Sequence, residues 1–157
     1  MSFEKELTQK FRSGTTDTSI SYSYNQGVVL GGLVELNKAS PNQSYIDSAN
    51  TIAQAGIKLL ADSNNVIHDT CEDDGSCFPD ATQFKGVFIR NLLLLHQASP
   101  NDLYATVIQA CAQSIWANNR DTSTNELSVN WAGPLVSPTN SSAHSSAMDA
   151  LVAAIYL

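Results

Sequence analysis

Apolar residues recur at helical spacing along most of the chain and define five segments with a helix-forming pattern. Segments 26–38 and 84–97 carry apolar residues on most sides, which predicts helices buried among their neighbours. Segments 43–61 and 102–118 alternate apolar and polar positions with a helical period, which predicts amphipathic helices lying over the first two. Segment 143–156 is predicted to be a further helix.

The first four segments form two copies of one unit. With a shift of 59 residues, GVVLGGLVELNKASPNQSYIDSANTIAQ from Gly27 aligns without gaps with GVFIRNLLLLHQASPNDLYATVIQACAQ from Gly86. Ser-Pro-Asn separates the two helices in both copies, because proline stops one helix and suits the first turn of the next. The repeat therefore predicts an all-α fold built from stacked α/α hairpins.

The length of the repeat predicts the size of the assembly. At 59 residues per hairpin, 157 residues hold about 2.7 hairpins, whereas a closed ring of six would need roughly 350 residues. We therefore expect about half of an (α/α)6 toroid in residues 21–157, preceded by an N-terminal segment at 1–20. A half-toroid exposes inner-helix surface, so we also expect self-association through that surface.

Composition and charge exclude several function classes. The chain is 43% apolar and 15% charged, which is a globular composition. A net charge of −7 with only eight scattered Lys and Arg residues argues against binding to nucleic acids and to anionic membranes. No apolar run approaches the roughly 20 residues of a membrane span. Its N-terminus, MSFEKELTQKFRSG, is polar and does not resemble a secretory signal.

The short acidic loop CEDDGSC offers candidate chemistry. Asp73 and Asp74 are consecutive, so their side chains point apart, and we expect a solvated or structural loop rather than a catalytic pair. A calcium site is not predicted, because the turn glycine is displaced and the bidentate glutamate is missing. Together with the two cysteines of this loop, His68 would provide at most three zinc ligands, and their spacing is unusual for a zinc site. We therefore expect no metal and no cofactor.

Four motifs in a fixed order carry a resemblance to a known family. SYNQGVVLGGLVEL, the cysteine-flanked acidic loop, QFKGVFIRNL and NWAGP resemble glycoside hydrolase family 76, from about Ser21 to the C-terminus. Its members are endo-α-1,6-mannanases of bacteria and fungi with an (α/α)6 barrel. The resemblance implies mannan as the partner and an extracellular or cell-wall location. Two sequons, at Asn42 and Asn140, agree with secretion, whereas the polar N-terminus does not, and this conflict stays open.

The resemblance also implies which residues contact a glycan. The predicted binding residues are Tyr24, Asn25, Gln26, Phe84, Lys85 and Trp131. Inner helices of a toroid begin at the mouth of its central cleft, where amides suit sugar hydroxyls and aromatic rings stack on pyranose faces. Phe84 and Trp131 are expected to stack, and Lys85 to donate to a hydroxyl or balance a carboxylate. Taken singly, such residues more often have other roles: a tyrosine such as Tyr24 or a tryptophan such as Trp131 packs, Asn25 caps a helix and Lys85 is solvated. Their ordered occurrence at equivalent positions of the repeat is what favours a role in the cleft.

The predicted function follows from the same resemblance. The family uses a consecutive Asp-Asp pair, which we expect upstream of this chain, so no catalytic residue is assigned within it. We expect a Cys71–Cys77 disulfide in an oxidising compartment. The chain is then a fragment of a mannan endo-1,6-α-mannosidase that supplies part of its glycan-binding cleft. Alternatives are a non-catalytic glycan-binding half-toroid, a mannan transglycosylase-like protein and a structural α/α repeat protein.

Overall fold

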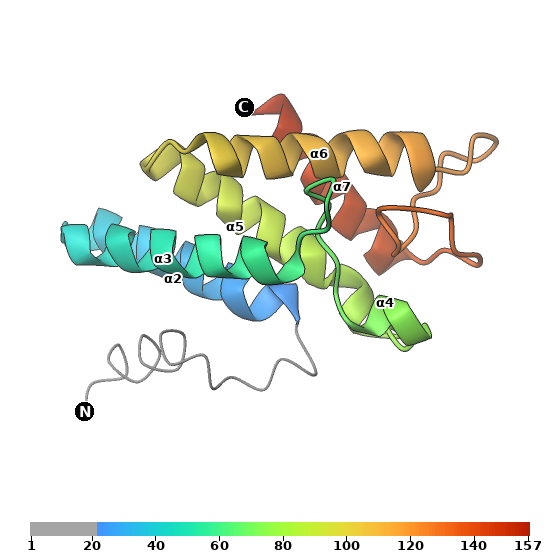
Figure 1. Ribbon diagram of the computed structural model, residues 1–157, viewed down its shortest axis with the longest axis horizontal. Helices are drawn as coiled ribbons and strands as arrows, with labels where there is room; N and C mark the ends of the chain where they lie inside the picture. Colours follow the sequence, from blue (N-terminus) through green and yellow to red (C-terminus); the bar gives the residue numbers. More distant parts are fainter. Residues whose placement is uncertain (1–21) are drawn as a thin grey trace.

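The computed structural model describes residues 22–157, and the predicted N-terminal segment 1–20 lies outside these (Figure 1). The elements are α2 (Ser23–Ala39), α3 (Gln43–Leu60), α4 (Cys71–Asp74), the 3-10 turn η1 (Ala81–Gln83), α5 (Phe84–Ala98), α6 (Asp102–Asn118) and α7 (Ser141–Ile155). Within residues 22–157 extended pairing is limited to two isolated bridges, Ala61–Ile67 and Arg120–Leu127. The predicted all-α class is confirmed.

The helices form two layers. Helices α2, α5 and α7 make the inner layer, with α5 between the other two, while α3 packs on α2 and α6 packs on both α5 and α7 (Figure 1). The core between the layers is apolar and fully buried, with Leu30 and Phe88 on the inner side and Ile108 on the outer side. The predicted packing of an outer helix on an inner one is therefore present in both hairpins, but in the second hairpin the outer helix α6 is no less apolar than the inner helix α5.

The Ser-Pro-Asn turn caps the following outer helix in the same way in both copies. The Asn42 side chain accepts the Ser44 N–H at 3.0 Å and caps α3, and the Asn101 side chain accepts the Leu103 N–H at 2.9 Å and caps α6. These bonds satisfy amide groups that have no partner within the helix. The asparagine of the repeated motif thus sets where each outer helix begins.

Successive inner helices approach each other at repeated glycines. A Cβ atom on Gly27 would lie 2.6 Å from the Phe88 Cα, and one on Gly86 would lie 2.7 Å from the Ser146 Cα. These glycines are equivalent in the 59-residue repeat, so α2 meets α5 as α5 meets α7.

Replacing Gly27 with alanine is expected to destabilise the fold by about 1–3 kcal/mol, because the obstructing atoms belong to the backbone of α5 and cannot rotate away. Gly32→Ala is the matched control, since a Cβ atom on Gly32, in the same helix, would have no neighbouring atom within 4 Å. Alanine there should stabilise the chain by about 0.5–1 kcal/mol through helix propensity alone. Urea unfolding measures both, and equal effects of the two substitutions would contradict the close-contact explanation.

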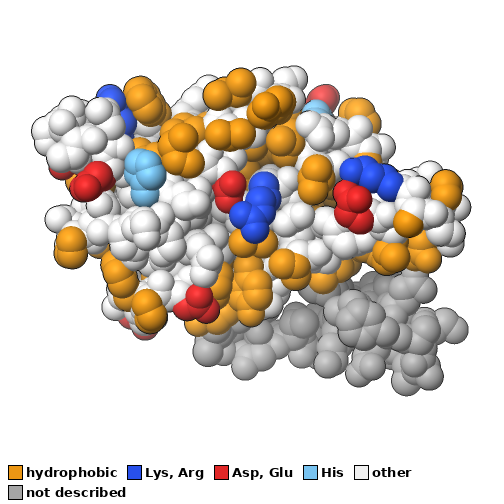
Figure 2. Space-filling model, turned by 180° about the vertical axis from the view of Figure 1, so that it is seen from behind, with side chains coloured by type: hydrophobic (Ala, Val, Ile, Leu, Met, Phe, Trp, Pro, Cys, Tyr) orange, Lys and Arg blue, Asp and Glu red, His pale blue; other side chains and the backbone are white. Residues whose placement is uncertain are grey.

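Part of the inner layer remains exposed. Val28 and Leu36 on α2 and Val152 and Ile155 on α7 are exposed apolar side chains, and hydrophobic side chains gather at several places on the face in Figure 2. The self-association expected from such a surface stays a prediction. Among the described residues, no helix combines the length and the hydropathy needed to cross a membrane.

Candidate functional site

Three aromatic side chains meet where the inner helices α2 and α5 begin. The ring centroids of Tyr24 and Phe84 lie 4.2 Å apart, and the Tyr22 ring meets Phe84 edge-on at 5.3 Å. All three side chains are half-buried, and the neighbouring Asn25 is exposed. The structure therefore brings together Tyr24 and Phe84, which the sequence predicted at one mouth, and adds Tyr22. We call Tyr22, Tyr24 and Phe84 the aromatic cluster.

Three of the predicted binding residues lie inside the protein. Gln26 is 9% exposed, Lys85 2% and Trp131 0%. Trp131 therefore presents no ring face to a ligand, which corrects its expected role as a stacking platform. Instead the Lys85 Nζ lies 4.8 Å from the centroid of the Trp131 ring, as in a cation–π contact. The NWAGP loop thus closes over α5 and packs there.

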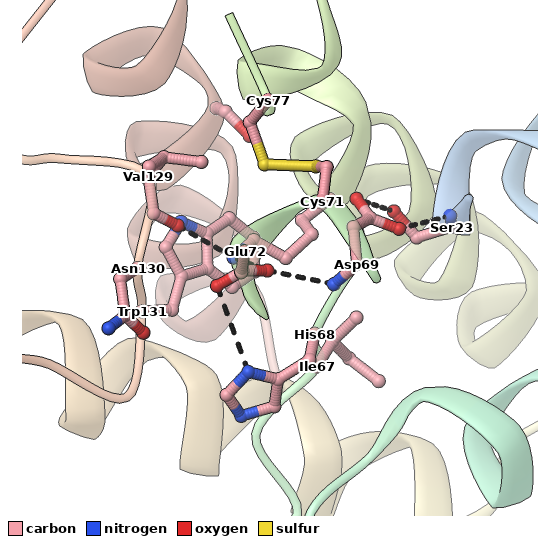
Figure 3. A network of polar contacts seen from close by, with 12 residues as sticks. Ser23, Ile67, His68, Asp69, Cys71, Glu72, Cys77, Val129, Asn130 and Trp131 are labelled. Carbon is pink, nitrogen blue, oxygen red and sulfur yellow. Dashed lines mark hydrogen bonds and ion pairs between the residues drawn. A yellow bond between two sulfur atoms is a disulfide. The ribbon is translucent and has the colours of Figure 1, made fainter. Parts of the chain in front are cut away.

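Lys85 has a buried counter-charge. Its Nζ donates to the Glu72 Oε1 at 2.5 Å and to the Val129 carbonyl at 2.7 Å (Figure 3). The same Glu72 oxygen accepts the Asp69 N–H at 2.8 Å. A buried charge needs a partner and further hydrogen bonds to offset its desolvation, and both are present here. Of the two roles expected for Lys85, balancing a carboxylate is the one that its contacts fit.

Asp69 ties the disulfide loop to the start of α2. Its carboxylate accepts the Ser23 N–H at 2.5 Å and the Ser23 hydroxyl at 2.9 Å, and it is 2% exposed (Figure 3). Burial raises the pKa of Asp69 to about 6, and the Ser23 hydrogen bonds and the Lys85 charge oppose this only in part. Because Asp69 supplies a cap from a distant loop, α2 begins at Ser23, three residues before the predicted start.

The disulfide loop is a structural element beside these contacts. Cys71 and Cys77 are bonded and both buried (Figure 3). Asp73 and Asp74 are exposed on the short helix α4. Hydrogen bonds from Ser76 lower the pKa of Asp74, whereas a general acid at neutral pH needs a raised pKa. Asp74 is therefore poorly suited to protonate a leaving group.

Sequence reasoning missed the network formed by Ser23, Asp69 and Glu72. Asp69 and Glu72 lie close together in sequence, but Ser23 is 46 positions away from Asp69. One signal was available: Lys85 occupies a face of α5 that the apolar pattern predicts to be buried, and a buried lysine requires a carboxylate partner. That signal could indicate a partner but not which of the chain's carboxylates provides it.

Sequence comparisons identify relatives of this chain. The sequence model of Glycosyl hydrolase family 76 matches residues 7–156. Mannan endo-1,6-alpha-mannosidase DFG5 of Saccharomyces cerevisiae is 30% identical over 124 residues, covering 74% of this chain and 26% of the relative. The Candida albicans protein of the same name is 26% identical over 98 residues, covering 61% of this chain and 22% of the relative. The chain thus spans about a quarter of the length of these curated relatives.

Solved structures share the fold. The Lin0763 protein from Listeria innocua superposes with a TM-score of 0.77 at 28% identity, covering 94% of this chain and 41% of that protein. An inactive variant of an alpha-1,6-mannanase from a Salegentibacter species was solved in complex with alpha-1,6-mannotriose. It superposes with a TM-score of 0.70 at 19% identity, covering 86% of this chain and 40% of that protein. The chain matches a little less than half of each neighbour, as expected for about half of an α/α toroid. The chain belongs to glycosyl hydrolase family 76.

Proposed function

We propose that this chain forms part of the glycan-binding cleft of a glycoside hydrolase that acts on α-1,6-mannan. Family membership and the activity for which the two yeast relatives are named support the substrate class. The alpha-1,6-mannotriose bound to the Salegentibacter variant supports the same linkage. Within the chain, the observation that carries the proposal is the half-buried aromatic cluster at the start of two adjacent inner helices.

The aromatic cluster has the chemistry of a sugar-binding surface. Pyranose rings present an apolar face of C–H groups that packs on aromatic rings, and the Tyr22 and Tyr24 hydroxyls can bond to sugar hydroxyls. The exposed amide of Asn25 follows directly on Tyr24 and offers both a donor and an acceptor. A neutral glycan also avoids repulsion from a chain of net charge −7.

The buried contacts behind the aromatic cluster hold it in place. The Ser23–Asp69 hydrogen bonds position the first turn of α2, which carries Tyr24. The Lys85–Glu72 ion pair positions the first turn of α5, which carries Phe84. Because both carboxylates come from the segment 69–72, one loop sets the relative position of the two helix starts. This fits a binding surface that must be rigid before its ligand arrives.

Glycan binding, and not bond cleavage, is the role we assign to the described residues. Hydrolysis requires two suitably placed carboxyl groups. Asp73 and Asp74 are exposed on the disulfide loop and take no catalytic role in this proposal. The two carboxyl groups of the proposed enzyme come from the remainder of its toroid. A secreted or cell-wall location is part of the proposal and agrees with the disulfide.

Replacing Tyr24 or Phe84 with alanine is expected to weaken binding of α-1,6-mannotriose by about tenfold, because each change removes one stacking ring. Isothermal titration of the 157-residue chain measures the dissociation constant. Tyr45→Ala is the matched control, since Tyr45 is also a half-buried tyrosine but begins the outer helix α3. This substitution should change the dissociation constant for α-1,6-mannotriose by less than about twofold.

Cellotriose serves as the specificity probe for the same titration. The proposal expects no measurable binding of this β-linked glucan at concentrations that saturate the chain with α-1,6-mannotriose. Equal affinity for the two trisaccharides, or unchanged mannotriose affinity in both alanine variants, would overturn the assignment of the aromatic cluster to mannan.

A further inference from the structure

Two motifs of the sequence have no part in the proposed function. These are the Asn-X-Ser sequons that begin at Asn42 and Asn140, and both fit the acceptor pattern for N-linked glycans. Each asparagine caps a helix. The Asn42 Oδ1 accepts the Ser44 N–H at 3.0 Å, and the Asn140 Oδ1 accepts the Ala143 N–H at 2.7 Å. Neither the motif nor the cap distinguishes the two sites, so the difference between them lies in their surroundings.

The sequon at Asn42 is open to solvent. Asn42 and Ser44 are both exposed, in the turn between α2 and α3. The hydrogen bonds found within residues 22–157 use the Asn42 Oδ1 and backbone, but neither its Nδ2 nor the Ser44 hydroxyl. An N-linked glycan attaches to the Nδ2 and leaves the amide oxygen in place, so a modified Asn42 still caps α3. A glycan here therefore displaces no contact of the described fold.

The sequon at Asn140 is tied into the fold. Asn140 is half-buried and lines a cavity together with Glu126 and His144. The Ser142 hydroxyl donates to the Asn140 Oδ1 at 2.9 Å and lies 2.7 Å from the Thr82 hydroxyl, which joins the start of α7 to the segment before α5. A bulky glycan on Asn140 would crowd this lining and these contacts. Folding and glycan attachment therefore oppose each other at Asn140 but not at Asn42.

The turn that holds Asn42 lies far from the aromatic cluster. Helix α2 has 17 residues, so its two ends are about 25 Å apart. Tyr24 lies in its first turn, whereas Asn42 follows its last residue. Figure 1 shows the turn between α2 and α3 at one end of the two layers and α4 at the other. A glycan on Asn42 therefore leaves the aromatic cluster free to bind its own ligand.

We infer that Asn42 is an N-glycosylation site and that Asn140 stays unmodified. This inference rests on the secreted or cell-wall location in the proposed function, because the sugar donor, a lipid-diphosphate-linked oligosaccharide, is used in the secretory pathway. Transfer forms a bond between the Asn42 Nδ2 and the anomeric carbon of the first sugar. The bond from that carbon to the diphosphate oxygen breaks, the lipid diphosphate leaves with the electron pair, and the Nδ2 releases one proton.

Expression of the 157-residue chain behind a secretion signal in insect cells tests this inference. The chain is purified from the medium and from the secretory membranes, and its glycans are released by peptide N-glycosidase in water labelled with heavy oxygen. Each asparagine that carried a glycan becomes a labelled aspartate, which mass spectrometry of the peptides identifies. The label is expected at Asn42 and not at Asn140.

Ser44→Ala is the matched variant. It removes the hydroxyl of the sequon but keeps the backbone N–H that the Asn42 cap uses. This variant should lose the glycan and keep the helical circular dichroism of the unchanged chain. Asn101 is an internal control, because it caps α6 in the equivalent turn but has Leu103 in place of the sequon serine. The peptide that contains Asn101 should therefore carry no label.

The inference is overturned by an unlabelled Asn42, by equal labelling of Asn42 and Asn140, or by a glycan that persists in Ser44→Ala. Titration with α-1,6-mannotriose tests the proposed function separately. The glycosylated chain and Ser44→Ala should bind it with dissociation constants that agree within about twofold. Weaker binding by the glycosylated chain would contradict a glycan that leaves the aromatic cluster free. Absence of binding by both would overturn the proposed function and leave the assignment of Asn42 standing.

Discussion

Replacing Lys85 with methionine is expected to destabilise the fold by about 3–5 kcal/mol, because it removes the ammonium group from the buried Glu72 carboxylate and leaves only the His68 ring nearby, with its Nδ1 3.7 Å from the Glu72 Oε2. The side chains of this pair are only 2% and 5% exposed, so water cannot replace the missing partner. A loss of this size is a large share of the roughly 5–15 kcal/mol that usually separates folded from unfolded chains. Urea unfolding monitored by helical circular dichroism measures it.

Two controls separate the buried ion pair from a general effect of losing a lysine. Lys38 pairs with Glu35 at 2.8 Å, but both side chains are more than half exposed, so Lys38→Met should cost less than about 1 kcal/mol. Adding Glu72→Leu to Lys85→Met removes the orphaned charge and should recover a large part of the loss. Similar losses for the two lysine variants, or no recovery in the double variant, would contradict the assignment.

Asp69→Asn is expected to stabilise the fold increasingly as pH rises. In the folded chain the pKa of Asp69 is about 6, above its ordinary value of 3.8, so between these values the folded state binds more protons than the unfolded state. The contribution of Asp69 to the free energy of unfolding is therefore greatest below about pH 4 and falls as pH rises through 6. The pKa difference of about two units corresponds to about 3 kcal/mol.

Comparing the variant with the unchanged chain isolates this one group. Asparagine can still accept the Ser23 N–H but carries no charge at any pH, so the stability difference should be near zero at about pH 4. By about pH 7.5 it should reach about 2–3 kcal/mol in favour of the variant. Asp74→Asn is the control on the same loop: Ser76 lowers the pKa of Asp74, so its pH dependence has the opposite sign. A difference between Asp69→Asn and the unchanged chain that does not vary with pH would contradict this account.

These two predictions bear on binding as well as on stability. Asp69 and Glu72 lie in the same short segment and position the helix starts that carry Tyr24 and Phe84. Weakening either contact should therefore loosen the aromatic cluster before the whole fold is lost. Glycan titrations of the Lys85 and Asp69 variants are best interpreted together with their unfolding curves.

The helices and their pairing into hairpins follow from the amino-acid sequence alone. Helical periodicity depends on residues that are close together in sequence. The same is true of the helix caps, in which Asn42 caps α3 and Asn101 caps α6. The ungapped repeat also placed Gly27 and Gly86 at equivalent points, where the structure shows equivalent close approaches. The family motifs added the position of Tyr24 and Phe84 at the helix starts.

Which polar side chains lie inside, and what they contact, depends on the packing of segments that are far apart in the chain. Lys85 takes its carboxylate from a loop 13 residues away and a carbonyl from a loop 44 residues away, while the ring of Trp131 closes over it. Arg90 on α5 and Asp149 on α7, 59 positions apart, are likewise brought together only by the packing of these two helices. Such partners depend on how helices and loops pack in three dimensions, and burial is the result of that packing rather than a property of any short segment.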